Sequence, residues 1–485
     1  MRILSPDLND ITECKLGFRG VVVVLLLTAL YFVSFFYLPS MIRHLLLAGV
    51  ALIIVLLVRP KPAFWLPFLP LVFLAGGSTI PTGEFNPAIA TIAMVTFTFF
   101  YISDRILWNK PLFVPSRYLF YLLIAIFIQA ISVFISVHLQ GQHAWNAIRD
   151  GSSIFLFFPI AVIIPSLCTT ENKFNQLLRA VMLTLLVAAT IAVLQYILIK
   201  GFSRVDMSLG YVYRGRVSSL FLGNPNAFAG YLELSIPLSI AMFFREKKVK
   251  WRITAATAVI LGVVSVLYTF SRGGLICTFI GCGITLFYIF RSKVWIPIIL
   301  GVLMVIILAR NADTFERQMS FFLNPKANLN QPTILHRYVS YKGFLNQISE
   351  YPVTGIGWGA REFYSGRTLI YSFWEVRHCV STETILEFGG LNSLFLNQAV
   401  KGGIISLVSI LLMFGAILAA FIRALRNGGG ILAVALAAGI FSFMIHQFID
   451  NTIRIPAVNA QFWIISGLLL ILAGCEFWKC NTEQE

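Results

Sequence analysis

Arginines in the second half of the chain stand where a fixed positive charge could bind a phosphate group. Arg214 and Arg216 precede the sequence Asn224-Pro225-Asn226, and Arg272 lies in a Ser-Arg-Gly-Gly sequence between two apolar runs. A guanidinium group can hold phosphate oxygens through two parallel hydrogen bonds and keeps its charge in partly dry surroundings. These residues therefore predict a binding site for an anionic ligand.

The Asn-Pro-Asn sequence predicts the start of a helix. Asn224 can cap the first turn, and Pro225 has the backbone angle that a first helical position requires. The free N–H groups at such a helix end attract anions. We expect Asn226 to contribute to the anion site, while the alternative is an ordinary helix cap with arginines at a membrane interface.

A third segment, residues 336–363, contains Arg337 and a glycine-rich turn. Aromatic and aliphatic side chains at helical spacing predict an amphipathic helix, and the turn that follows includes Gly355 and Gly357. The glycines do not follow a strand of a βαβ unit, so they do not indicate a dinucleotide site.

The elements that position these residues must cross a membrane. Hydrophobic residues make up 58% of the 485 residues and charged residues 12%, against about 45–50% and about 25% in soluble domains. This composition excludes soluble enzymes and nucleic-acid-binding proteins. Solid apolar blocks also exclude outer-membrane barrels, whose strands alternate in polarity. We predict an all-α polytopic membrane protein.

Apolar runs of a length that suits membrane spans predict about 12–14 transmembrane helices. The runs lie at 20–38, 41–58, 63–77, 86–102, 117–138, 151–167, 176–199, 226–244, 253–270, 273–290, 294–309, 398–422, 430–449 and 457–475. The chain therefore divides into N-terminal spans (1–200), core spans (201–309), an external loop folded as a small helical lid (310–397) and C-terminal spans (398–485).

Lys and Arg residues, which give the chain a net charge of +16, set the predicted topology through their distribution among the loops. If both termini lie in the cytoplasm, the Lys-rich loops also lie there, as the positive-inside rule requires. The cations left outside are mostly arginines, and these need a further reason. One reason is an anionic ligand, and the alternative is pairing with external acids and lipid headgroups.

Four blocks in a fixed order resemble the O-antigen ligase and O-antigen polymerase family of bacterial membrane glycosyltransferases. The blocks are the Asn-Pro-Asn segment with its preceding arginine, Ser-Arg-Gly-Gly, the segment from Arg337 to Thr-Gly-Ile-Gly-Trp-Gly, and the stretch from Asn392 to His446–Pro456. The resemblance covers roughly residues 210–475. Residues 1–200 share only their hydrophobicity with the family.

The resemblance implies an enzyme at the outer face of the bacterial inner membrane. Such proteins transfer a glycan from undecaprenyl pyrophosphate to a sugar hydroxyl of a lipid-linked acceptor or of the lipid A core. They use no cofactor, metal or nucleotide sugar, and the external segments contain no Asp-x-Asp pair. Arg216, Arg272 and Arg337 match the family's functional arginines, and Arg214 is a neighbouring candidate.

One family feature is missing. The family places His-Asn at the start of the helix that enters the membrane after the lid, whereas this chain has Leu391-Asn392. In a rival alignment His378 takes the place of that histidine. The general base therefore remains open among His378, Glu383 and Glu387, or position alone activates the acceptor.

The sequence leaves three functions to be separated. The missing histidine favours a polymerase over a ligase. A transporter or flippase for lipid-linked saccharides is the alternative from another class, since it too has about a dozen spans. Transporters show related halves and mid-membrane charges, whereas the polar residues here gather in one external region.

Overall fold

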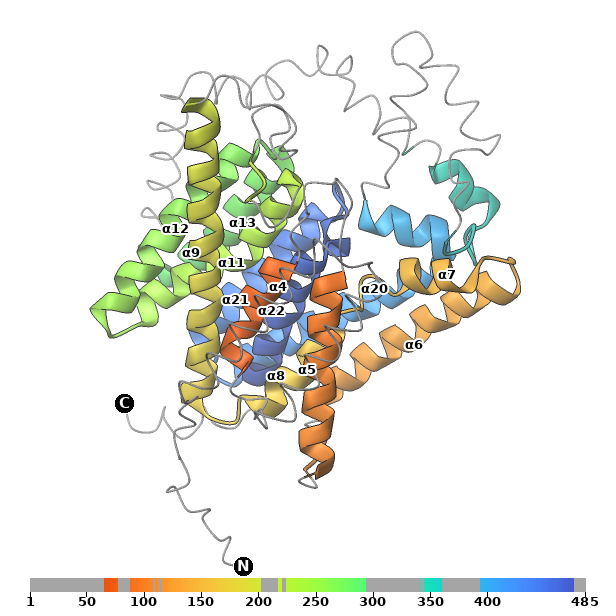
Figure 1. Ribbon diagram of the computed structural model, residues 1–485, viewed down its shortest axis with the longest axis horizontal. Coiled ribbons are helices and arrows are strands. Elements are labelled where there is room, and N and C mark those ends of the chain that lie inside the picture. Colours follow the sequence, from red (N-terminus) through yellow and green to blue (C-terminus); the bar gives the residue numbers. More distant parts are fainter. Residues whose placement is uncertain are drawn as a thin grey trace, which may run out of the picture.

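The computed structural model describes residues 65–76, 88–107, 110–112, 116–201, 217–219, 224–293, 341, 344–359 and 393–474. Within these residues every regular element is a helix. The elements are η1 (Leu66–Phe68), α4 (Leu69–Gly76), α5 (Ala88–Leu107), α6 (Arg117–His138), α7 (Ala144–Gly151), α8 (Phe158–Leu167), α9 (Glu171–Gly201), α11 (Pro225–Arg245), α12 (Val249–Thr269), α13 (Arg272–Ile289), α20 (Leu394–Arg426), α21 (Gly430–His446), η3 (Thr452–Arg454) and α22 (Pro456–Gly474). Figure 1 shows them as one bundle.

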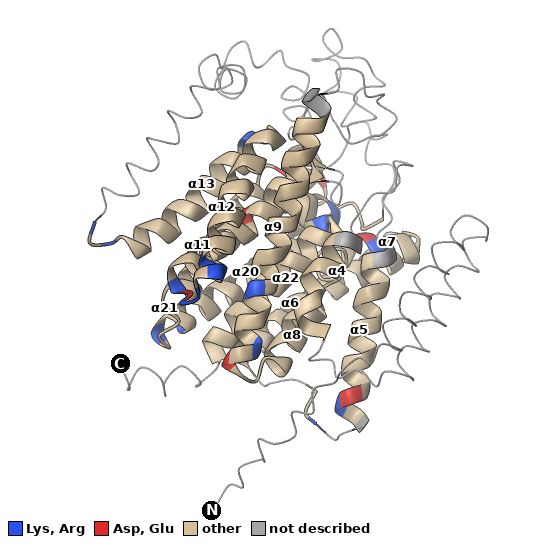
Figure 2. Ribbon diagram, turned by 60° about the vertical axis from the view of Figure 1, so that its left-hand side comes forward, with Lys and Arg blue, Asp and Glu red and all other residues tan. Residues whose placement is uncertain are grey.

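The prediction of an all-α polytopic membrane protein is confirmed. Among the described residues, seven helices are long and apolar enough to span a bilayer, namely α6, α9, α11, α12, α13, α20 and α22. Few charged residues interrupt the described helices (Figure 2). The predicted spans at 20–38, 41–58 and 294–309, and most of the predicted lid at 310–397, lie outside the described residues.

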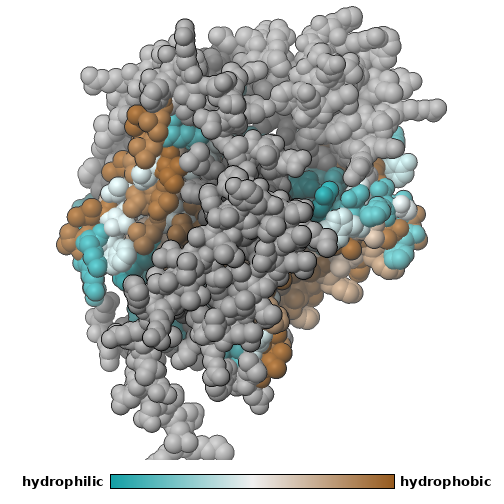
Figure 3. All heavy atoms as spheres, viewed as in Figure 1, coloured by the Kyte–Doolittle hydropathy of each residue, from teal (hydrophilic) through white to brown (hydrophobic). Residues whose placement is uncertain are grey.

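Two helices form the centre of the bundle. Of the 18-residue apolar stretch of each helix, 89% is buried in α11 and 94% in α22, against 33% in both α6 and α12. A helix that is apolar all round is buried on all sides, and α11 packs against α12, α13, α21 and α22. The outer helices show apolar side chains on their outward faces (Figure 3), as contact with lipid requires.

The predicted span at 151–167 is wrong as a continuous helix. Turns occupy residues 152–157, and α8 has only 10 residues, about 15 Å of the roughly 30 Å hydrocarbon core. Side chains of α22 supply hydrogen-bond donors to the backbone carbonyls of the turn. Asn459 Nδ2 donates to the carbonyls of Ser153 and Ile154 at 2.7 and 3.0 Å. Trp463 Nε1 also donates to Ile154 O at 3.0 Å. Periodicity alone does not reveal such a break within an apolar run.

The glycine-rich turn docks on a kink in α20. Gly403 has φ 62° and ψ −159°, and this break in the helix frees carbonyls that accept hydrogen bonds from the turn. Ile356 N donates to Val400 O at 2.9 Å, and Gly357 N donates to Lys401 O at 3.0 Å. A Cβ on Gly355 would lie 2.5 Å from the carbonyl carbon of Lys401, so only glycine fits there.

Trp358 anchors the same turn between α6 and α20. Its side chain is 1% exposed, and its Nε1 donates to Ser132 Oγ at 3.0 Å and Ser406 Oγ at 3.3 Å. Its backbone N–H donates to Ser136 Oγ at 3.0 Å. The base of the predicted lid is thereby fixed to two membrane helices.

The kink supplies a stability prediction. In Gly403→Ala, a Cβ would lie 2.1 Å from Val353 O and the backbone would remain in a region that only glycine populates readily. We expect a loss of about 2 kcal/mol or more, measured as a lower Tm of the detergent-solubilised protein. The control is Gly415→Ala on the same helix, where nothing lies within 4 Å of the added Cβ. Equal Tm values for the two variants would contradict the proposed constraint.

Candidate functional site

Asn224 starts α11 as the sequence predicts. Its Oδ1 accepts hydrogen bonds from the backbone N–H groups of Asn226 at 2.8 Å and Ala227 at 3.4 Å, and Pro225 occupies the first turn. The side chain of Asn226, which the sequence analysis assigns to the anion site, donates through Nδ2 to Asp450 Oδ2 at 3.0 Å. The start of α11 is therefore linked to the segment that follows α21.

Arg272 is the first residue of α13. Ser271 caps this helix by accepting from Gly274 N at 3.3 Å. The guanidinium group is therefore attached where the positive end of the helix dipole lies. Arg272 is partly buried.

The two glycines after Arg272 allow close contacts with two other helices. A Cβ on Gly274 would lie 2.3 Å from Ala229 Cβ of α11. A Cβ on Gly273 would lie 3.2 Å from His446 Cδ2 at the end of α21. The Ser-Arg-Gly-Gly sequence thus brings Arg272 to the place where α11, α13 and α21 meet.

A buried group of ionisable side chains lies at this meeting point. Glu233 and His446 are both 0% exposed, and His446 Nδ1 lies 2.7 Å from Glu233 Oε1. On the other side of the ring, Nε2 lies 3.7 Å from Asp450 Oδ2. Figure 1 shows that the two helices of the pair, α11 and α21, run side by side.

The segment 447–453 folds back on itself and holds the start of α20. Gln447 Nε2 donates to Thr452 Oγ1 at 2.9 Å, and Gln447 Oε1 accepts from Ile453 N at 3.1 Å. The carbonyl of Gln447 accepts from Leu394 N at 2.9 Å. The beginning of α20 therefore lies beside the end of α21.

These contacts define one end of the bundle, which we call the motif end. It comprises residues 224–226, 271–274, 352–359, 393–403 and 446–456. Backbone contacts extend it further, since Val217 N donates to Tyr268 O at 2.9 Å. Five segments that are separated in the sequence meet there.

A second charged cluster stands at the motif end. Asp150, the penultimate residue of α7, pairs with Lys401 of α20 through Oδ2 and with Arg454 of η3 through Oδ1. The backbone of Gly359 also hydrogen-bonds to this carboxylate. Three membrane-boundary elements and the glycine-rich turn are thereby connected through one acid.

The charges of this cluster set the protonation of Asp150. Burial opposes the ionised form, but Arg454 and Lys401 outweigh it and hold the pKa of Asp150 below its ordinary value. Arg454, which the predicted topology places outside the membrane, thus pairs with an acid, as the alternative to an anionic ligand expects.

Comparison with known proteins gives a match over part of the chain. Residues 257–389 match the family model described as O-antigen ligase. Residues 257–389 are therefore similar to an O-antigen ligase domain. This confirms the resemblance to the O-antigen ligase and polymerase family and supports a function of that type in polysaccharide assembly, with a glycosyltransferase-like activity on lipid-linked glycans. No curated protein matches the chain.

The matched residues include part of α12, the whole of α13 and the turn at 352–359. Of the predicted site residues, the structure brings Arg272, Asn224, Pro225, Asn226, Gly355 and Gly357 to the motif end. The others, Arg214, Arg216, Arg337, His378, Glu383, Glu387 and Asn392, lie outside the described residues.

The sequence analysis missed the acids and the histidine of the buried group. Glu233 stands alone in the apolar run 226–244, and an ionisable residue inside a membrane span is itself a signal of function. His446 and Asp450 stand in the stretch that carries the family resemblance, without an assigned role. Their spacing, i and i+4, gave no hint that Glu233 lies next to them.

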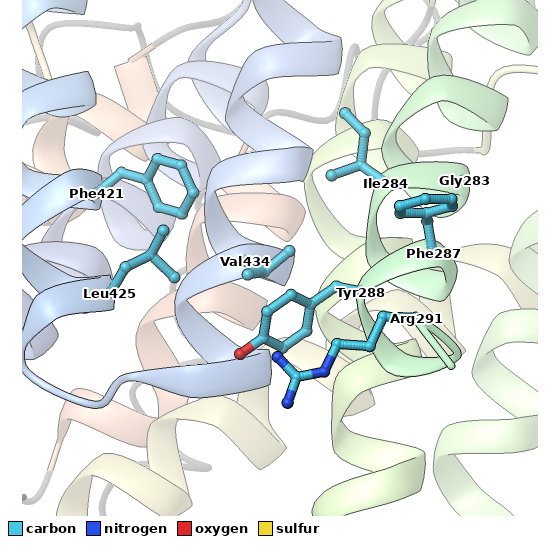
Figure 4. A pocket seen from close by; sticks show the side chains of 8 residues that line it. All are labelled: Gly283, Ile284, Phe287, Tyr288, Arg291, Phe421, Leu425 and Val434. Atoms are coloured by element: carbon cyan, nitrogen blue, oxygen red, sulfur yellow. The ribbon is translucent and has the colours of Figure 1, made fainter. Parts of the chain in front are cut away.

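A large apolar cavity lies at the opposite end of the bundle, away from the motif end. It has a volume of about 690 Å³ and lies between α13, α20 and α21, with Phe287, Phe421 and Val434 in its wall. Figure 4 shows Arg291 beside Tyr288 at its edge. Its lining offers few polar groups for a sugar, so it is not a candidate reaction site. Within the described part of the chain, no group of three or more His, Cys, Asp or Glu could hold a metal ion.

Asp150 yields a prediction on stability and pH. Asp150→Asn leaves Lys401 and Arg454 without their shared counter-ion, so we expect a loss of about 3 kcal/mol, seen as a lower Tm at neutral pH. Because the folded-state pKa is depressed, the wild-type contribution is complete above the ordinary value of 3.8 and is lost as the pH falls below it.

The control for this prediction is Asp104→Asn. Asp104 pairs with Lys110 at 3.6 Å, and the lysine side chain is 49% exposed, so the pair contributes at most about 1 kcal/mol. If the two substitutions lowered the Tm equally, Asp150 would not link α7, α20 and η3 energetically.

Proposed function

We propose that this chain transfers a glycan from undecaprenyl pyrophosphate to a sugar hydroxyl of a lipid-linked acceptor at the outer face of the bacterial inner membrane. We place both termini in the cytoplasm and favour a polymerase. The observation that supports this most strongly is the meeting of three separated motif segments, 224–229, 271–274 and 446–450, at the start of α13, where Arg272 stands.

The reaction requires positive charge at the leaving group. The acceptor oxygen forms a bond to the anomeric carbon, the bond from that carbon to the phosphate oxygen breaks, and the pyrophosphate takes the electron pair. Arg272, which stands at the positive end of the α13 helix dipole, can stabilise this developing charge. Arg214, Arg216 and Arg337 are proposed to share this task, with no metal ion.

The acceptor hydroxyl must lose a proton. His378, Glu383 and Glu387 stay the candidates from the sequence, and the geometry adds Asp450. Its side chain is 12% exposed and accepts from Asn226 at the motif end. Alternatively, the site activates the acceptor mainly by holding it close to the donor.

A transporter for lipid-linked saccharides is the second candidate. The buried Glu233–His446 pair favours it, since ionisable pairs inside a bundle also occur in proton-driven transporters. The transferase has more support, because the polar motif residues converge at one end of the bundle. Accumulation of lipid-linked units on the cytoplasmic face of a mutant strain would favour the transporter.

Arg272 provides the direct test. In a deletion strain that expresses the variants, we expect Arg272→Ala to abolish long-chain glycan on a polysaccharide gel. Arg272→Lys should keep a minor fraction, because lysine retains the charge but not the two-pronged donor. Arg291→Ala, at the opposite end of the bundle, should leave the glycan ladder unchanged. A normal ladder from Arg272→Ala at wild-type protein level would refute the transferase.

The deletion strain separates a polymerase from a ligase. Loss of a polymerase should leave single repeat units attached to the lipid A core, whereas loss of a ligase should remove all glycan from it. We expect the first outcome, because the histidine that the family places before Asn392 is missing. Gel analysis of the extracted lipopolysaccharide distinguishes the two outcomes.

A further inference from the structure

The Glu233–His446 pair lies inside the bundle, where neither side chain is exposed, and it connects α11 with α21. We propose that Glu233 and His446 are positioning residues that hold the Asp450 carboxylate and the start of α13 in the arrangement that glycan transfer needs. This inference rests on the proposed function. It assigns a task to two residues that do not reach the reacting sugars.

The pair is poorly explained by stability alone. Removing two charges from water costs several kcal/mol per ion, and apolar side chains of similar size often stabilise a protein as well or better. A carboxylate at this depth therefore indicates a demand for a charge at a fixed place. Because the Glu233 side chain is not exposed, its charge acts on neighbouring groups of the protein.

The imidazole ring of His446 contacts the neighbours that matter. Its Nδ1 lies 2.7 Å from Glu233, and its Nε2 lies 3.7 Å from Asp450 Oδ2. The same Asp450 oxygen accepts from Asn226 at 3.0 Å. A ring held by Glu233 on one side thus directs its other nitrogen toward the only acid of the group that is partly exposed.

The ring also supports the turn that carries Arg272. A Cβ on Gly273 would lie 3.2 Å from His446 Cδ2 and 3.3 Å from Nε2, so the backbone of α13 rests against the ring. Any rotation of the ring therefore changes the contact with the first turn of α13. Through His446, Glu233 fixes both Asp450 and the backbone that precedes and follows Arg272.

The charges around the ring are few. Glu233 faces it from α11 and Asp450 from the following segment, while Arg272 and Cys277 are the nearest titratable residues on α13. The adjoining helix α22 has no titratable residue. With both acids ionised and His446 protonated, the group has a net charge of −1. Loss of the Glu233 charge removes the counter-ion of the imidazolium.

The experiment compares a carboxylate inside α11 with the carboxylate that directly follows this helix. Glu233→Gln keeps the side-chain size and removes the charge. The matched control is Glu246→Gln at the other end of α11, where Glu246 is also buried and pairs with Arg179 at 2.7 Å. Both variants are assayed in detergent-permeabilised membranes with undecaprenyl-diphosphate-linked glycan extracted from the deletion strain, at equal protein level.

We expect Glu233→Gln to lower the transfer rate at saturating donor at least tenfold, with a less than twofold change in the donor concentration for half-maximal rate. Glu233→Asp should restore part of the rate, and Glu246→Gln should match the wild type. The transfer rate of Glu233→Gln should begin to fall at a lower alkaline pH than that of the wild type, because the imidazolium has lost its carboxylate. A purely structural role would move the amount of protein but not this profile.

Two outcomes would overturn the inference. One is a rate for Glu233→Gln equal to that of Glu246→Gln, and the other is a reduced rate with an unshifted pH profile that Glu233→Asp does not improve. Neither outcome affects the proposed transferase, which fails only if Arg272→Ala retains activity. The positioning role and the function are therefore tested separately.

Discussion

A carboxyl group enclosed by apolar helices needs a polar partner, and in this protein His446 Nδ1 lies 2.7 Å from Glu233 Oε1. That requirement fixes α11 against α21 at one depth and in one rotation. The start of α13 follows, because Gly273 packs on the same imidazole ring. The motif end is built outward from this single pair.

Small residues let the remaining elements approach. Gly274 brings α13 against Ala229, and the break at Gly403 opens α20 so that its carbonyls can hold the turn at 352–357. Asp150 then joins α7, α20 and η3. The fold thus places short polar segments at the ends of long apolar helices, which are otherwise uniform in chemistry.

The helical class and most of the described spans could be predicted from the sequence, because apolar runs of sufficient length have few alternatives in a bilayer. The Asn224 cap and the role of Gly355 in a turn were equally visible, since both depend on local backbone geometry. The break at 152–157 was not visible, because its hydrogen-bond partners stand about 300 residues away on α22. The same holds for Glu233 and His446, whose contact depends on how two distant helices pack.

The turn before α8 also has a consequence for biogenesis. Its carbonyl groups receive their hydrogen bonds from Asn459 and Trp463, which leave the ribosome about 300 residues after the turn. Until then these carbonyls have no such donors, and unpaired carbonyls are costly in hydrocarbon. The segment around residue 155 can therefore reach its final depth only after α22 has been synthesised.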